Sequence, residues 1–175
     1  MSRAVLSLGS NLDDREAHLR AAVAGLGESI LAVSGVYETP AWGELPQPDF
    51  LNAVALVVDP AAGPADWLAL ARQLETAAGR LRDPALPAGP RSLDVDVITV
   101  WGADGAPVRS DDPELTLPHP RAHLRAFVLR PWLDIQPYAE LPGHGWVYDL
   151  VRRPPVVGDL GGLRVREDIS LEAAI

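Results

Sequence analysis

The stretch GPRSLDVDVITV, residues 89–100, is a run of branched apolar residues interrupted by two carboxylates, Asp94 and Asp96. Its apolar content predicts a buried strand, in which an unpaired charge is costly. Side chains alternate between the faces of a strand, so both acids share one face while Val95 and Val97 point to the other. Two carboxylates at this spacing can hold a pair of divalent ions, and all-oxygen ligation suits Mg²⁺.

The alternative is an edge strand whose acids face solvent or pair with arginines. Arg80, Arg82 and Arg91 lie in the same region, and guanidinium groups bind phosphates in a bidentate manner. A carboxylate pair, an arginine cluster and a proline-rich loop are the parts of a phosphoryl-transfer site. The sequence has no G-x-x-x-x-G-K-[ST] motif, so the site is not a P-loop.

Composition is that of a single soluble globular domain, residues 1–175, with 47% apolar and 22% charged residues. The net charge of −9 argues against a nucleic-acid-binding surface. No apolar run reaches the ~18–20 residues of a membrane span, the N-terminus lacks a secretory signal, and cysteine is absent. We therefore expect a cytoplasmic protein, a monomer, with neither nucleic acid nor membrane as a partner.

The order of predicted elements indicates an α+β two-layer sandwich with a largely antiparallel sheet. Expected strands cover residues 4–9, 31–39, 50–59 and 92–101, and expected helices follow a cap at Ser10 or Asn11 and cover 64–79. A strand, a turn and a short helix are expected over 115–132. The tail from about residue 143 has weak signals, and VRRPPVVGDLGG (151–162) is expected to be a surface loop. Two proline-rich segments, 40–49 and 80–90, are long enough to be binding loops.

Two further patterns have simpler readings beside the functional ones. His119 and His123 have the spacing of a helical zinc pair, but no Glu follows His119 and Pro120 sits at the helix start. Phe50 and Phe127 could stack on a flat heterocycle or could simply be core residues.

The motif GPRSLDVDVI (89–98) resembles the signature of the 6-hydroxymethyl-7,8-dihydropterin pyrophosphokinase family of the folate pathway. Three more blocks resemble that family in order and at compatible spacing: LSLGSNLDDREAHLRAA (6–22), VYETPAWGELPQPDFLNAV (36–54) and LTLPHPRAHLRAFVLRPW (115–132). Together they cover about residues 4–137, with a C-terminal extension after about 143.

The resemblance implies a ferredoxin-like fold and transfer of the β,γ-pyrophosphoryl group of ATP to the hydroxymethyl group of the dihydropterin, with release of AMP. It implies that Asp94 and Asp96 hold two Mg²⁺ ions and that Arg80, Arg82 and Arg91 contact the nucleotide or its phosphates. The other residues that it places at the ATP are Arg72, Glu75, Val97 through its backbone, Thr116, His119 and Arg125. Those that it places at the pterin are Thr39, Pro40, Trp42, Phe50, Asn52 and Phe127.

The chain departs from the family pattern just before Gly-Pro-Arg, where Pro87 and Ala88 replace a basic residue and often a Trp. The departure bears on closure of the loop more than on metal binding. Two competing hypotheses remain: a nucleotide- or pterin-binding protein without turnover, and a different two-metal enzyme, such as a nucleotidyltransferase or nuclease, that uses the same acids.

Overall fold

The computed structural model describes residues 1–172 and contains a six-stranded antiparallel sheet. The strand that carries the two carboxylates, β5 (Asp94–Trp101), is an edge strand of this sheet. The sheet has the order β10-β3-β4-β1-β5, and β2 also pairs with β4. The other strands of this sheet are β1 (Ser2–Ser10), β2 (Ile30–Val33), β3 (Tyr37–Thr39), β4 (Phe50–Asp59) and β10 (Arg164–Val165). Two small two-stranded sheets are formed by β6 (Ser110–Asp112) with β7 (Leu115–Leu117) and by β8 (Glu140–Leu141) with β9 (Gly145–Trp146).

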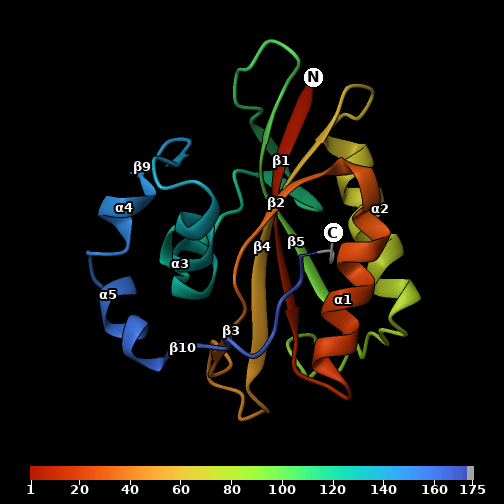
Figure 1. The fold of residues 1–175 in the computed structure, drawn as a ribbon, viewed down its shortest axis with the longest axis vertical. Helices are drawn as coiled ribbons and strands as arrows, with labels where there is room; N and C mark the ends of the chain where they lie inside the picture. Colours follow the sequence, from red (N-terminus) through yellow and green to blue (C-terminus); the bar gives the residue numbers. More distant parts are fainter. Residues whose placement is uncertain (173–175) are drawn as a thin grey trace.

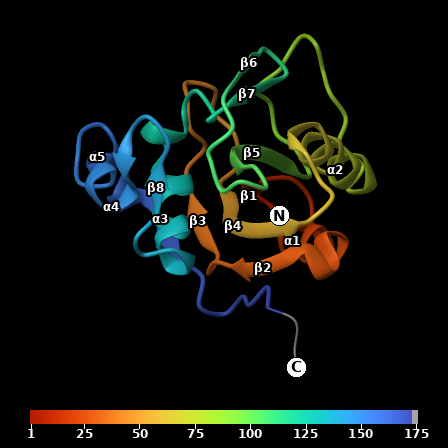
Figure 2. The same cartoon turned by 90° about the horizontal axis from the view of Figure 1, so that it is seen from above.

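Helices cover both faces of the central sheet (Figures 1 and 2). One face carries α1 (Arg15–Leu26) and α2 (Pro64–Ala77), which form the expected α+β sandwich with the sheet. The opposite face carries α3 (Ala126–Ile135), α4 (Val147–Leu150) and α5 (Val156–Asp159), a further helical layer. Short 3-10 turns follow or precede these helices: η1 (Gly27–Ser29), η2 (Ala122–Leu124) and η3 (Leu160–Gly162). No helix within residues 1–172 is long and apolar enough to cross a membrane.

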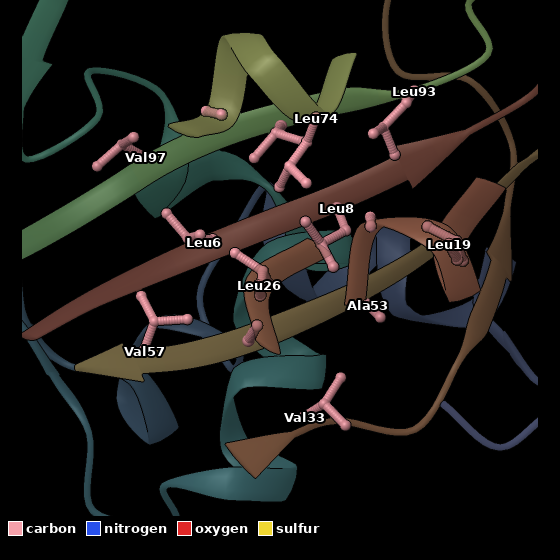
Figure 3. Packing of buried hydrophobic residues seen from close by; sticks show 14 of the residues in the cluster. Leu6, Leu8, Leu19, Leu26, Val33, Ala53, Val57, Leu74, Leu93 and Val97 are labelled. Carbon is pink, nitrogen blue, oxygen red and sulfur yellow. The ribbon is translucent and has the colours of Figure 1, made fainter. Parts of the chain in front are cut away.

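Alternation along the strands divides the buried residues into two cores. Leu6 and Leu8 of β1 face α1 and α2 together with Val97 of β5 (Figure 3). Val5 and Ile98 belong to the second core, beneath α3. The predicted alternation of β5 is therefore confirmed, with the apolar residues 95 and 97 buried on the α2 side and the acids on the other face.

The expected cap of the first helix is wrong. Ser10 is the last residue of β1, and the N-cap of α1 is Asp14, whose carboxylate accepts a hydrogen bond from the N–H of Ala17 at 3.0 Å. The chain turns at Asp13, where φ is +60°, so the helix begins later than its polar residues indicated. The side chain of Asn11 is used elsewhere, between the two long loops.

The strand expected over residues 31–39 is two strands, β2 and β3. Between them, the backbone N–H of Ser34 donates to the carbonyl of Val54, while the Ser34 hydroxyl accepts from the N–H of Val54, both at 2.8 Å. The serine side chain thus replaces a ladder carbonyl, and the strand is interrupted there.

The expectation of a surface loop over residues 151–162 is also wrong in part. This stretch contains α5 and η3, and it leads into β10, which pairs antiparallel with β3. Ile169 and Leu171 are each only 5% exposed and pack into the core beneath α1 and α2. Pairing with a strand so distant in the sequence left no local signal to predict it.

Candidate active site

Asp94 and Asp96 lie at the end of β5 that faces the two long loops. Their neighbours across the strand pair are Gly9 and Ser7 of β1. A Cβ atom at Gly9 would lie 2.8 Å from the side-chain oxygen of Asn52, so only glycine fits between the acids and β4. The two side chains are 24% and 30% exposed, which leaves both carboxylates accessible from one side.

Three arginines neutralise these acids in the structure. Arg80 donates from Nη1 to Asp94 Oδ1 at 2.8 Å, and Nε of Arg91 lies 3.2 Å from Asp94 Oδ2. Arg125 donates from Nη1 to Asp96 Oδ2 at 3.1 Å. These contacts agree with the alternative interpretation of the sequence, in which the acids pair with arginines. They are also compatible with a binding site, because cationic groups surround the two carboxylates.

Glu75 of α2 holds two of the predicted arginines. It is 5% exposed and accepts hydrogen bonds from Arg80 and, at 3.0 Å, from Nη2 of Arg82. The N–H of Val95 donates to the same carboxylate at 3.3 Å, which ties α2 to β5. Arg80 is anchored further by a 3.2 Å hydrogen bond to the carbonyl of Leu93, whereas the side chain of Arg82 is 67% exposed.

Burial and charge perturb two titratable groups beside these arginines. Burial, followed by the negative charge of Asp94, raises the pKa of Asp96 to about 6 against the lowering effect of Arg125. Burial, followed by the charges of Arg125 and Arg121, lowers the pKa of His119 to about 4. Nε2 of His119 lies 3.9 Å from Asp96 Oδ2, so a neutral imidazole faces an acid whose charged form is disfavoured.

A pocket of about 470 Å³, counting the space at its mouth, opens on one side of the acids. Its lining includes all six residues that the family resemblance assigns to a pterin: Thr39, Pro40, Trp42, Phe50, Asn52 and Phe127. The Asn52 amide donates to the hydroxyl of Thr39 at 2.7 Å, which fixes its orientation between the aromatic side chains. The expectation that Phe50 and Asn52 share a face is confirmed, because both line this pocket.

The aromatic side chains of this pocket carry guanidinium groups on their faces. Arg91 lies over Phe50 at 5.1 Å, and Arg125 lies over Trp42 and Phe127 at 5.2 and 5.5 Å. These are cation–π distances, so the same arginines contact the carboxylates and the rings.

A second, open hollow lies on the other side of the acids. Its lining includes most of the residues that the family resemblance assigns to ATP: Arg72, Glu75, Arg80, Arg82, Arg91, His119 and Arg125. Arg121, to which the sequence assigned no role, lines it too. Pro87 and Ala88 form part of its rim. Asp94, Asp96, Arg91 and Arg125 line both hollows, so the acids lie at their junction.

Two predicted nucleotide residues do not line this hollow. The side chain of Val97 is buried in the core, where only its backbone could take part in binding. The Thr116 hydroxyl of β7 donates to the carbonyl of Asp112 at 3.0 Å. Arg72 lies at the edge, 3.3 Å from Glu114.

Asn11 joins the two long loops and was assigned by its sequence to a turn or cap. Its amide donates to Gln47 Oε1 at 2.9 Å and to the carbonyl of Pro48 at 3.0 Å, both in the first loop. Its Oδ1 accepts from the N–H of Arg91 at 2.8 Å, and Gln47 donates to the carbonyl of Ala88 at 2.9 Å. Partners so distant in the chain gave no local signal.

The two histidines of the zinc alternative belong to different surroundings. His123 stacks on His144 with ring centroids 4.1 Å apart, whereas His119 faces Asp96. Within residues 1–172 no three His, Cys, Asp or Glu side chains gather as a metal cluster. Two carboxylates alone suit Mg²⁺, which keeps waters and completes its shell with substrate phosphates, better than zinc.

Comparison with known proteins gives one consistent result. A model of the family described as 7,8-dihydro-6-hydroxymethylpterin-pyrophosphokinase (HPPK) matches residues 5–137. The protein named 2-amino-4-hydroxy-6-hydroxymethyldihydropteridine pyrophosphokinase from Mycobacterium tuberculosis is 48% identical over 145 residues, 81% of this chain and 76% of that protein. Proteins of the same name are 51% identical over 146 residues in Mycobacterium leprae (81% and 75%) and 35% identical over 162 residues in Pseudomonas aeruginosa (90% and 95%).

Solved structures share the fold at low sequence identity. The wild-type HPPK-DHPS of Plasmodium falciparum with pterin and p-hydroxybenzoate gives a TM-score of 0.64 at 14% identity over 94% of this chain. An HPPK-DHPS structure in complex with substrates gives 0.60 at 11% identity over 86% of this chain. The chain spans 46% and 43% of those proteins, so the match concerns one part of each.

Proposed function

The chain belongs to the 7,8-dihydro-6-hydroxymethylpterin-pyrophosphokinase family, and from that premise we propose its reaction. As a pyrophosphokinase of folate biosynthesis, it uses ATP to diphosphorylate the hydroxymethyl group of 6-hydroxymethyl-7,8-dihydropterin, and AMP is released. The observation that carries this proposal is the junction of two hollows at Asp94 and Asp96, one lined by aromatic rings and the other by arginines.

The pterin occupies the aromatic pocket. Phe50 and Phe127 stack on the two faces of the flat ring, while Asn52, held by Thr39, hydrogen-bonds to its edge. Pro40 and Trp42 close the pocket from the first long loop. In this position the hydroxymethyl group points toward the carboxylates, where the second hollow begins.

The triphosphate of ATP occupies the arginine-lined hollow. Arg80, Arg82 and Arg91 bind its phosphates, because planar guanidinium groups match phosphate oxygens in pairs. Glu75 keeps Arg80 and Arg82 in place. Arg72, His119 and Arg125 complete the nucleotide site in this hollow. Roles for Thr116 and for the backbone of Val97, which do not line it, stay predictions of the family resemblance.

Asp94 and Asp96 would hold two Mg²⁺ ions, and the donor set fits them. When bound, the ions neutralise phosphate oxygens and favour the ionised form of both acids. The acids are partly exposed and already surrounded by cationic partners, so Arg80, Arg91 and Arg125 can exchange their carboxylate contacts for phosphate contacts. His119, with a pKa lowered to about 4, stays neutral at physiological pH and adds no charge to this exchange.

The reaction is an in-line attack of the pterin hydroxyl oxygen on the β-phosphorus of ATP. The O–P bond to the pterin forms as the bond between the β-phosphorus and the AMP oxygen breaks, and the hydroxyl proton is released to the medium. The arginines stabilise the charge that develops on the departing AMP phosphate. A loose transition state needs little help from a general base. The loops 40–49 and 80–90, joined through Asn11, exclude the water that would otherwise hydrolyse ATP.

One assay tests the reaction against its competitors. The protein is incubated with Mg-ATP, with and without 6-hydroxymethyl-7,8-dihydropterin, and AMP is measured by chromatography. We expect AMP only with the pterin. Binding of both ligands without AMP would indicate a binding protein, and AMP or pyrophosphate without the pterin would indicate a different two-metal enzyme. A cytoplasmic monomer, one domain over residues 1–175, stays our prediction for the protein.

A further inference from the structure

The residues after the matched family region pair with a strand that contributes to the wall of the pterin pocket. The match to the family ends at residue 137, whereas the pairing of β10 with β3 comes from residues 164 and 165. β3 lies between β10 and β4, with Glu38 opposite Arg164 on one side and Leu51 on the other. Thr39, the last residue of β3, is the partner of Asn52.

Glu38 pairs with three arginines, two of which, Arg164 and Arg166, belong to the C-terminal segment. Its side chain is 12% exposed and contacts Arg164, Arg166 at 3.3 Å and Arg15 of α1 at 2.7 Å. Burial acts to raise the pKa of Glu38, but the hydrogen bond from Arg15 and the charges of the three arginines outweigh it and hold that pKa below its ordinary value.

The same arginines reach the segment that leads into Phe50. Arg15 donates to the carbonyl of Asp49 at 3.0 Å, and Arg164 lies 3.8 Å from the Asp49 carboxylate. The N–H of Arg166 donates to the carbonyl of Val36 at 2.8 Å, just before β3. Residues 36–38 are therefore held from the C-terminal segment, whereas Asp49 is held mainly by Arg15 of α1 and more distantly by Arg164.

The C-terminal segment also backs the pocket from outside. Gly162 lies against Pro40, since a Cβ atom there would be 3.5 Å from that ring. A hollow behind the wall is lined by Pro40, Trp42 and Phe127 on one side and by Asp159 and Leu163, among others, on the other. Further along, the chain crosses to the α1 side, where Arg20 donates to the carbonyl of Ser170 at 2.7 Å (Figure 1).

We infer that residues 158–171 set the position of the pterin-binding wall, with Arg164 and Arg166 as positioning residues that act on β3 through Glu38. The inference rests on the proposed function and deepens it. These arginines touch neither the acids nor the arginine-lined hollow, so their loss affects the pterin and leaves ATP binding unchanged.

The test is steady-state kinetics of the full-length Arg164→Ala/Arg166→Ala double variant. We expect the KM for the dihydropterin to rise on the order of tenfold, with kcat and the KM for ATP within about twofold of the wild type. Hydrogen exchange of residues 36–40 should become faster. In the Arg166→Ala background, Arg164→Lys keeps a positive charge opposite Glu38, so its KM for the dihydropterin should lie between those of the double variant and the wild type. Arg152→Ala is the matched control, because Arg152 lies on Tyr148 at the surface of α4.

Two results would overturn the inference: an unchanged pterin KM in the folded double variant, or a parallel change of kcat and both KM values. If the double variant does not fold, Arg166→Ala takes its place, because Arg15 and Arg164 remain on Glu38. Failure of the proposed function would appear in the wild type, as an absence of pterin-dependent AMP. Failure of this inference appears only in the variants of an active protein.

Discussion

Arg80 bridges Glu75 and Asp94: one guanidinium nitrogen contacts both carboxylates, at 2.8 Å from Asp94. The arginine and the glutamate are almost fully buried, with 9% and 7% of their side chains exposed. Arg80 therefore has a structural and a functional role, and it can be separated from Arg82, which contacts the same glutamate from solvent.

Arg80→Gln should cost about 2–4 kcal/mol of unfolding free energy, because it leaves Glu75 buried with one exposed partner. Arg82→Gln should cost less than about 1 kcal/mol, because its side chain is mostly exposed. Both should lower kcat if both bind phosphates. Urea denaturation and AMP release measure the two effects, and equal stability losses would contradict the assigned difference in burial.

Asp94→Asn and Asp96→Asn should each lower kcat by at least about 10²-fold, since the ionised pair is required at the developing phosphate charge. Each should also abolish the rise in melting temperature that Mg²⁺ with a non-hydrolysable ATP analogue produces in the wild type, and EDTA should remove that rise. Asp111→Asn, at an exposed acid of β6, is the control. Activity within tenfold of the wild type in either site variant would refute the metal assignment.

His119 should make stability depend on pH in a defined window. The pKa of His119 is lowered to about 4 in the folded protein, against about 6.5 in the unfolded chain. The free energy of unfolding should therefore be highest above pH 6.5 and should fall by about 2–3 kcal/mol as the pH is lowered to 4. His119→Gln should remove this dependence. Asp96, with a pKa raised to about 6, titrates in the opposite sense, so the comparison is repeated in an Asp96→Asn background. Parallel stability–pH curves would contradict the prediction.

Asn11→Ala should loosen both long loops. Asn11 is 2% exposed and joins them with three side-chain hydrogen bonds, so we expect a loss of about 2–3 kcal/mol and faster hydrogen exchange over residues 44–48 and 86–91. Gln47→Ala should speed exchange near Ala88 at a cost of less than about 1.5 kcal/mol, because Asn11 keeps its contact with Arg91. Equal exchange in the wild type and both variants would show that the loops are not joined there.

Tyr37→Phe should destabilise the protein by about 1–2 kcal/mol, because the Tyr37 hydroxyl donates to Asp134 of α3 at 2.8 Å. Burial first, then this hydrogen bond, raises the pKa of Tyr37 to about 12. The contribution is therefore present across pH 6–9 and is lost only as pH rises through about 10 toward 12. Guanidinium denaturation at pH 7 and pH 9 should give the same difference between the two proteins.

Local sequence patterns predicted those strands and helices in which the spacing of apolar residues determines which face is buried. Alternation around Asp94 and Asp96 gave the correct face of β5, and the helix expected over 64–79 is α2. The pairing of Phe50 with Asn52 on one pocket face followed from the same period.

What the sequence did not predict depends on contacts between distant residues. Asn11 is a residue type common at helix N-caps, but two of its hydrogen-bond partners lie 36 and 80 residues away, and Asp14 caps the helix instead. The segment around Arg164 is polar and rich in glycine, and it forms a strand because it pairs with the outer edge of β3. No motif gave Arg121 a role, and it lies in the arginine-lined hollow because the fold brings it there.

The pairing of β10 with β3 also has a consequence for how the protein is made. Without residues 164–165, β3 would present unpaired N–H and C=O groups on its outer side, and an open edge of this kind invites pairing with other chains. During synthesis the first 137 residues emerge before the strand that covers this edge. The nascent sheet therefore passes through a period of exposure to aggregation that ends only when its last strand arrives.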